Sequence, residues 1–217
     1  MERRHQQIDS NELHLEFPEL SQIQMKWLRE AQKFTEAQMG NSDFHGLGHV
    51  NRVIRNILSL MKVERGGDPF ILLFSAWLHD IGRETDKISK KNHAIKSGIL
   101  TRKFVIERKW GLQEETLKKI IDCIESHSFS SGRIQNSLEA KILSDADKLD
   151  ALGSVGIYRA ACYQHERGTG LAALKSHFDE KLLILDQKMH TKTGRKLAVE
   201  RISFMKLFIK NLLEELK

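Results

Sequence analysis

The chain has 217 residues, of which 40% are hydrophobic and 29% charged, and this composition excludes a disordered protein. Its 35 basic and 29 acidic residues are interspersed, so the net charge of +6 favours anionic ligands in general and does not single out nucleic acid. Two isolated cysteines provide neither a disulfide framework nor a Cys-x-x-Cys metal site. Because the N-terminus is polar and no window approaches 18 consecutive apolar residues, we expect a cytoplasmic protein without a membrane span.

The spacing of apolar residues predicts a chain that is almost entirely helical. Only two prolines occur, and strand-like alternation is rare. Apolar residues recur at helical spacing in segments separated by glycine and polar stretches, which predicts helices over about residues 20–39, 49–61, 69–78, 92–108, 113–125, 138–152, 157–163, 171–188 and 195–216. We find no repeat and no domain boundary, and therefore expect one all-α domain over residues 1–217.

The third predicted helix is the most informative element. Asp68 and Pro69 are favourable as N-cap and first helical residue, and the run Phe70–Leu78 is apolar on nearly every side, so this helix should be central. The run ends in His79-Asp80, an imidazole next to a carboxylate. Since an unpaired buried charge is costly, either the pair caps the helix and begins a turn, or both residues bind a metal, and we favour the metal.

Other histidines and aspartates also lie near the ends of predicted helices. Along the chain the candidates for metal or catalytic chemistry are His49, His79-Asp80, His93, His127 and Asp147. Four of these positions fall at a predicted helix start or end beside a polar loop, where side chains from different helices can converge. Imidazole and carboxylate without thiolate suit manganese, iron, nickel or zinc. Magnesium prefers oxygen ligands and alone would not need so many histidines, but it is kept as an alternative.

The ordered set of motifs resembles the HD superfamily of metal-dependent phosphohydrolases, and especially its small stand-alone bacterial members. The resemblance runs from about Asp43 to Tyr158, which we take as the core of the domain (about 43–160), with residues 165–217 as C-terminal helices packed on it. The segments that carry it are His49-Val-Asn-Arg-Val53, Leu78-His-Asp-Ile-Gly82, Asn92-His-Ala94, Ile124-Glu-Ser-His-Ser128 and Glu139–Gly153. It implies a helical bundle with a metal site at converging helix ends.

The resemblance also implies a ligand set. The metal would be held by His49, His79, Asp80 and Asp147, of which Asp147 matches the family's Ala-Asp-x-Leu pattern. Asp150 lies three residues further on the same helix face and is expected to support a ligand. Asp145, on roughly the opposite face, is expected to be structural.

Two histidines leave an alternative open. Members of the superfamily with additional histidines tend to bind two metals bridged by the HD aspartate, so His93 and His127 would hold a second metal. Alternatively, these two histidines act as cations that bind the phosphate of the substrate. In either role they belong to the predicted catalytic residues.

The reaction implied by the resemblance is hydrolysis of a phosphate ester or anhydride, in a small substrate similar to a nucleotide, by metal-activated water. Asp80 would orient or deprotonate that water. Arg52, on the face of His49, is the first choice for a phosphate contact, because its planar guanidinium matches phosphate oxygens. Arg83 and Lys148 are further candidates for binding the substrate.

Three alternatives to this function are a di-iron oxygenase of the same fold, a regulatory domain that senses a nucleotide with little turnover, and a nucleic-acid binder, for which no motif is visible. The two C-terminal helices could form a lid, a dimer surface or a cover for the core, so a homodimer is one expectation. Several histidines are expected to be ordinary structural or surface residues: His5, His14, His45, His165, His177 and His190.

Overall fold

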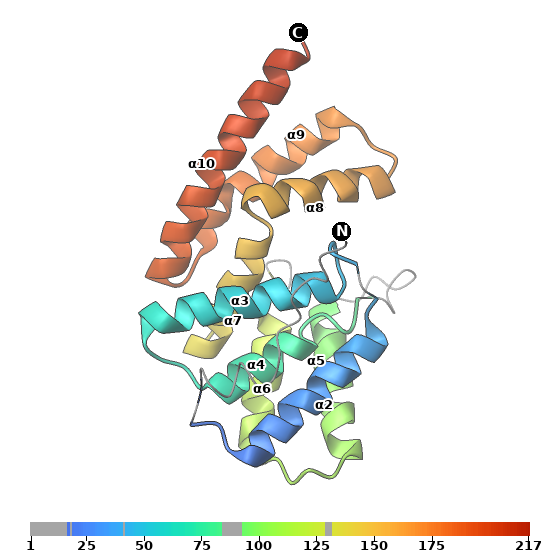
Figure 1. Cartoon of the computed structure of the whole chain (residues 1–217), viewed down its shortest axis with the longest axis vertical. Coiled ribbons are helices and arrows are strands. Elements are labelled where there is room, and N and C mark those ends of the chain that lie inside the picture. The colour runs from blue at the N-terminus through green and yellow to red at the C-terminus, as the bar shows by residue number, and fades with distance from the viewer. Residues whose placement is uncertain (1–16, 18, 41, 84–92, 129–131) are drawn as a thin grey trace, which may run out of the picture.

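The computed structural model describes residues 17, 19–40, 42–83, 93–128 and 132–217. These residues form helices and no strand, which confirms the all-α fold (Figure 1). In chain order the elements are α2 (Gln22–Gln38), α3 (Leu47–Glu64), α4 (Pro69–Leu78), α5 (His93–Glu107), α6 (Glu114–Ser126), α7 (Leu138–Asp150), α8 (Gly153–Glu166), α9 (Leu171–Glu180), the 3-10 helix η3 (Leu182–Lys188) and α10 (Lys192–Glu215). The expectations of a polar lead-in over 1–16 and of a polar connection over 84–91 lie outside the described residues.

Helix α4 is the centre of the fold, as its sequence predicts. Asp68 accepts hydrogen bonds from the backbone N–H groups of Phe70 and Ile71, and Pro69 takes the first helical position. Every residue from Phe70 to Leu78 is buried, because α2, α3, α6 and α7 all pack around this helix. An apolar helix surrounded on all sides fixes the position of whatever follows its last residue, and here that is His79-Asp80.

Helices α8, α9 and α10 lie at the end of the molecule opposite α2, and α10 runs along its edge (Figure 1). Helix α10 is attached to the core through its N-terminus. The buried carboxylate of Asp145 on α7 accepts hydrogen bonds from the backbone N–H of His190 and from the N–H and hydroxyl of Thr191, the N-cap of α10. Asp145 therefore has the structural role expected for it.

The helix expected over 171–188 is wrong in one respect. The α-helix ends at Glu180, and after Lys181 the chain continues as the 3-10 helix η3. Residues three apart lie above one another in a 3-10 helix, so the tighter winding turns both Leu182 and Leu185 into the core beside α10. Among the described helices, none is both long and apolar enough to cross a lipid bilayer.

Candidate metal centre and adjacent cavity

Five elements bring the predicted ligands together at their ends. His49 lies in the first turn of α3, His79 and Asp80 follow the last residue of α4, and Asp147 lies near the end of α7. His93 is the first residue of α5, and His127 is the C-cap of α6. The structure therefore gathers all six candidates, although they are spread over about a hundred residues of sequence.

One oxygen of Asp80 faces the first group of ligands. His49 Nε2 lies 3.2 Å from His79 Nε2, 3.4 Å from Asp80 Oδ2 and 3.4 Å from Asp147 Oδ1. His79 Nε2 lies 3.8 Å from the same Asp80 oxygen. Four potential ligand atoms of two chemical types thus point into one small space, as the predicted ligand set requires.

The other oxygen of Asp80 faces the two additional histidines. Asp80 Oδ1 lies 3.5 Å from His93 Nε2 and 3.5 Å from His127 Nε2. Within the described part of the chain, these three buried atoms have no hydrogen-bond partner. Buried polar atoms are rarely left without a partner, so three that converge on one point fit a binding site for a cation.

Carbonyl groups fix how two of the histidines are oriented. His79 Nδ1 donates to the carbonyl of Ala76 at 2.7 Å, and His127 Nδ1 donates to the carbonyl of Ile124 at 2.5 Å. Because a carbonyl only accepts, Nδ1 of each ring carries a proton, and Nε2 is the ring nitrogen that faces the centre. Both rings are thereby prepared to act as metal ligands.

Asp150 holds His49 from behind. Its carboxylate lies 2.7 Å from His49 Nδ1 and also pairs with the guanidinium groups of Arg52 and Arg159. A carboxylate behind a ligand histidine orients the ring and increases its basicity. The expectation that Asp150 supports a ligand agrees with these contacts.

The charges of the cluster are strongly perturbed. Burial lowers the pKa values of His79 and His93 to about 4, so both rings are neutral at pH 7. Burial and Arg159 also act to lower the pKa of His49, but its hydrogen bonds with Asp147, Asp150 and Asp80 outweigh them and raise it to about 9. Burial acts to raise the pKa of Asp80, but Arg83 and the surrounding histidines hold it well below its usual range.

The residues fit a divalent metal. Imidazole nitrogens and carboxylate oxygens form the donor set that manganese, iron, nickel and zinc accept. Two overlapping groups, His49-His79-Asp147 and His79-Asp80-His127, each have one ligand atom per residue within 4.8 Å of one another. The Arg83 guanidinium pairs with Asp80 and supplies positive charge beside the anionic ligands.

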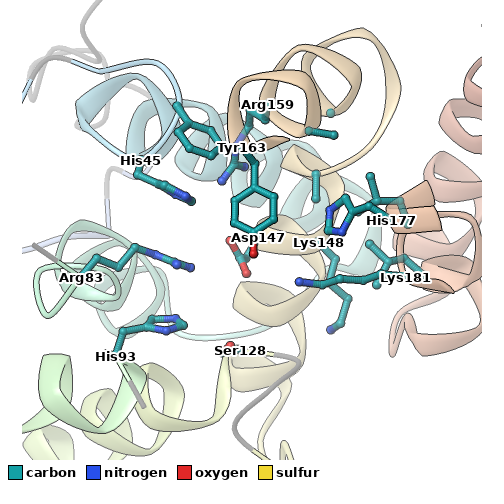
Figure 2. A pocket seen from close by; sticks show the side chains of 16 residues that line it. His45, Arg83, His93, Ser128, Asp147, Lys148, Arg159, Tyr163, His177 and Lys181 are labelled. Atoms are coloured by element: carbon teal, nitrogen blue, oxygen red, sulfur yellow. The ribbon is translucent and has the colours of Figure 1, made fainter. Parts of the chain in front are cut away.

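A cavity of about 350 Å³ opens next to this cluster. Figure 2 shows His45, Arg83 and His93 on one side of it and His177 and Lys181 on the other, with the Asp147 carboxylate between them. Its described lining includes four cationic side chains: Arg83, Lys148, Arg159 and Lys181. Asp147 is the acidic residue among the described lining residues, and two of the four cations, Arg83 and Arg159, also pair with the carboxylates of Asp80 and Asp150.

Sequence reasoning missed part of the cavity. The sequence predicts ordinary structural or surface roles for His45 and His177, but both line the cavity, as do Arg159, Tyr163 and Lys181. One signal was available: Arg159 and Tyr163 are four residues apart on α8 and therefore share a face.

His45 is placed by a close approach of two backbone segments. A side chain at Gly46 would lie 2.1 Å from the carbonyl of Gly40, so this turn requires glycine. The turn puts the His45 ring against Phe44, and burial lowers the pKa of His45 to about 3. His45 is therefore neutral in the cavity wall, and its buried Nδ1 has no hydrogen-bond partner among the described residues.

Arg52 departs from the expectation. It shares a face with His49, as predicted, but it is not among the described residues that line this cavity. Its guanidinium is held by the carboxylate of Asp150 and the carbonyl of Asp43. Arg83 and Lys148, the other two residues predicted to bind substrate, do line the cavity.

Comparisons with known proteins agree with this geometry. The HD domain family profile matches residues 46–152. The uncharacterized protein YpgQ from Bacillus subtilis strain 168 is 31% identical over 181 residues, which are 79% of this chain and 84% of YpgQ. The crystal structure of YpgQ in complex with ADP has a TM-score of 0.72 at 27% identity and covers 89% of this chain and 96% of that chain.

Two further solved structures bear the name of the superfamily. An HD-superfamily hydrolase from Bacillus thuringiensis has a TM-score of 0.67 at 26% identity and covers 88% of this chain and 97% of that one. A predicted HD superfamily hydrolase from an uncultured Thermotogales bacterium has a TM-score of 0.62 at 26% identity. The match covers 97% of this chain and 100% of that one. With its ordered histidines and aspartates and a fold shared with these hydrolases, the chain belongs to the HD superfamily.

Proposed function

We propose that the protein is a metal-dependent phosphohydrolase that cleaves a phosphate ester or anhydride in a nucleotide-like substrate. The observation that carries the proposal is the position of the cation-lined cavity directly beside the cluster of ligand atoms. Asp147 belongs to both, since its Oδ1 lies 3.4 Å from His49 Nε2 and its carboxylate lines the cavity. A phosphate held by the cations would therefore lie next to the metal ligands.

The cations of the cavity would bind and orient the phosphate. Arg83 and Arg159 have planar guanidinium groups that match phosphate oxygens, and the ammonium of Lys181 adds charge from the opposite wall. Arg159 also contacts Asp150, the carboxylate that holds the His49 ring, and so connects the proposed phosphate site with a candidate metal ligand. In a cavity partly shielded from water, such charges are more effective than on an open surface.

The remaining walls suit a nucleoside. The rings of Tyr163 and His177 lie 5.5 Å apart at 30°, and together with Phe44 and Leu185 they offer apolar and aromatic surface beyond the cations. The relative YpgQ has a solved structure in complex with ADP. We extend nucleotide binding from that protein to this chain as part of the proposal.

His49, His79, Asp80 and Asp147 would hold one metal, and Asp80 Oδ1 with His93 and His127 would hold a second. When bound, the metal supplies a Lewis acid for a phosphoryl oxygen and lowers the pKa of a coordinated water. The neutral state of His93, with its pKa of about 4, favours the ligand role over the alternative of a cation that binds phosphate.

The positive cavity also separates the proposed function from its alternatives. An oxygenase acting on an uncharged substrate has no use for four cationic side chains around the site. A domain that only senses nucleotides does not need the full ligand set, and here all six candidate ligands converge. Both features support turnover of a phosphorylated substrate.

The test is release of phosphate or pyrophosphate by the purified full-length protein. Nucleotides and simple phosphate esters would be offered with manganese, iron, nickel, zinc or magnesium, beside Asp80→Ala as the inactive control. We expect release that requires one of the transition metals and is lost in the variant. Absence of release across the panel from a wild-type protein that does bind metal would refute the proposed hydrolase.

A further inference from the structure

Arg201 on α10 contacts the last turn of α7, the helix that ends at Asp150. Its half-buried guanidinium donates from Nη1 to the carbonyl of Leu149, the residue before Asp150, and from Nη2 to Asn56 Oδ1 at 3.1 Å. Carbonyl groups in the last turn of an α-helix have no hydrogen-bond partner within the helix. The Leu149 carbonyl accepts from backbone N–H groups just beyond α7, and Arg201 adds a contact from a helix that holds none of the candidate ligands.

Asn56 extends this contact back along α7. Its Nδ2 donates to the carbonyl of Ala146, the residue before Asp147, at 3.0 Å. The side chain of Asn56 is buried, and both ends of its amide are engaged, one with Ala146 and one with Arg201. Because Asn56 belongs to α3, the helix of His49, the two contacts join α3, α7 and α10.

The stem of Arg201 covers the junction between α7 and α8. Gly153, the first residue of α8, has a φ of 72°, which favours glycine, and a Cβ at this position would lie 3.3 Å from Arg201 Cγ. Helix α8 carries Arg159, which pairs with Asp150. Arg201 thus lies where the chain passes from the helix of Asp147 to the helix of Arg159.

We infer that Arg201 is a positioning residue of the candidate metal centre. By holding the last turn of α7, it fixes Asp147 beside His49 and Asp150 behind the His49 ring. The inference rests on the metal binding that the proposed function requires. It makes the metal affinity depend on α10, although the hydrogen bonds of Arg201 go to a backbone carbonyl and to Asn56.

The charge of Arg201 and its hydrogen bonds act on the metal affinity in opposite directions. Arg201 and Asp150 border a common cavity, so the guanidinium lies on the side of the metal centre that Asp150 closes. A positive charge there repels a divalent cation, and its loss alone would strengthen metal binding. Loss of the hydrogen bonds would free the last turn of α7 and weaken metal binding. The sign of the change therefore separates positioning from charge.

The experiment is calorimetric titration of the metal-stripped full-length protein with Mn²⁺, well below the unfolding temperature of each variant. Arg201→Met keeps an apolar stem and removes every donor. It should weaken Mn²⁺ binding about tenfold, the lower end of the effect of groups that support metal ligands. Arg201→Lys, which retains an ammonium, should recover part of the loss. With Co²⁺ as the probe, Arg201→Met should also alter the visible absorption spectrum, because that spectrum depends on the geometry of the ligands.

Two control variants on α10 separate positioning from stability and from net charge. Ile209→Ala, about two turns further along the helix, removes buried apolar packing and should lower the stability of the protein. It should leave the Mn²⁺ affinity and the Co²⁺ spectrum as in wild type. Lys196→Met removes one positive charge from an exposed position and should also bind both metals as wild type does.

Mn²⁺ binding by Arg201→Met that equals or exceeds that of wild type would overturn the inference, as would an equal loss of affinity in Ile209→Ala. If Arg201→Met does not fold, Asn56→Ala takes its place, because it removes the other half of the same contact and should weaken binding in the same direction. Assays of phosphate release report separately on the proposed hydrolase. A wild type that releases no phosphate, together with weakened Mn²⁺ binding in Arg201→Met, would remove the hydrolase and keep the positioning role.

Discussion

Asp80 is the residue on which the candidate metal centre depends. Its two oxygens face different partners, Oδ2 toward His49 and His79 and Oδ1 toward His93 and His127. A carboxylate that divides its oxygens in this way could serve as a ligand in both groups of candidate metal ligands. The sequence alone left two roles open for His93 and His127, and this division favours the role of ligands.

Asp150, which contacts the candidate ligand His49, should affect how tightly the protein binds metal. Asp150→Asn removes the negative charge behind His49, so the ring loses the carboxylate that orients it and increases its basicity. We expect the affinity for Mn²⁺ to fall about tenfold to a hundredfold, as is usual when such a supporting group is replaced. Calorimetric titration of the metal-stripped protein measures it.

Asp122→Asn, at an exposed position of α6, makes the same change of charge and should leave the affinity unaltered. Equal Mn²⁺ affinity for Asp150→Asn and wild type would show that Asp150 serves only the arginines beside it.

At this scale the sequence identified the residues that converge at the candidate metal centre, but it identified the cavity poorly. His79 and Asp80 could be found because an apolar helix ends on them, and Asp147 because it completes an ordered motif. Lys181 and His177 carry no such local signal, since their direction is decided by the packing of α9 against α8. Arg52 illustrates the reverse case, in which helical spacing gave the correct face but could not show that Asp150 and Asp43 hold the guanidinium.

Among the elements, α3 and α10 are connected by a contact that depends on pH. Glu64, the last residue of α3, accepts a hydrogen bond from the backbone N–H of Thr193 in the first turn of α10. Contacts with Thr193 lower the pKa of Glu64 below its usual value of 4.5. A depressed carboxyl pKa stabilises the folded state above the unfolded pKa, and this contribution is lost as the pH falls through the folded pKa.

The prediction concerns Glu64→Gln. At pH 7 the variant should be less stable than wild type in urea denaturation, because the charged acceptor at the start of α10 is gone. The difference should shrink as the pH falls from about 4.5, where Glu64 of the unfolded chain takes up its proton, through the lower pKa that Glu64 has in the folded state. Glu107→Gln, at an exposed position of α5, is the matched control. A stability difference that stays constant from pH 7 to pH 3 would contradict the argument.

The sequence predicts the ends of a helix where neighbouring residues determine them, and fails where contacts with distant helices do. The start of α4 at Asp68-Pro69 follows directly from capping chemistry. The end of α9 does not, because nothing in the segment 171–188 breaks its helical periodicity. The change to η3 occurs because both Leu182 and Leu185 become buried beside α10, and that is a property of the packed molecule.

At the scale of the whole molecule, the C-terminal elements complete the cavity. The N-terminal half provides Arg83 and His93, whereas α8, α9 and the start of η3 provide Arg159, His177 and Lys181 (Figure 2). The roles expected for the last two helices were a lid, a dimer surface or a cover for the core; the geometry adds a different one, since the C-terminal elements form one wall of the cavity. Substrate binding would therefore depend on elements that hold none of the metal ligands.

Lys181→Met tests whether the C-terminal elements of the cavity wall bind substrate without contributing to metal binding. Loss of one ammonium from the cavity should raise the KM for the best nucleotide substrate about tenfold, the effect of one charged hydrogen bond, while metal affinity stays within twofold of wild type. Lys175→Met removes a lysine of α9 that pairs with Asp179 outside the cavity and should have no effect on KM. Steady-state kinetics and metal titration on the same preparations measure the two quantities. If Lys181→Met lowers the metal affinity as much as it raises KM, the C-terminal wall does not act on the substrate alone.

The measurement that tests the central claim most directly is the Mn²⁺ stoichiometry of the metal-stripped full-length protein and of two variants, by calorimetric titration with elemental analysis. The account predicts two equivalents for wild type, one for His127→Ala, which removes a ligand of the second group, and severely weakened binding for Asp80→Ala, which removes a ligand of both. Wild-type protein that binds no Mn²⁺, or Asp80→Ala that binds it as wild type does, would contradict the account.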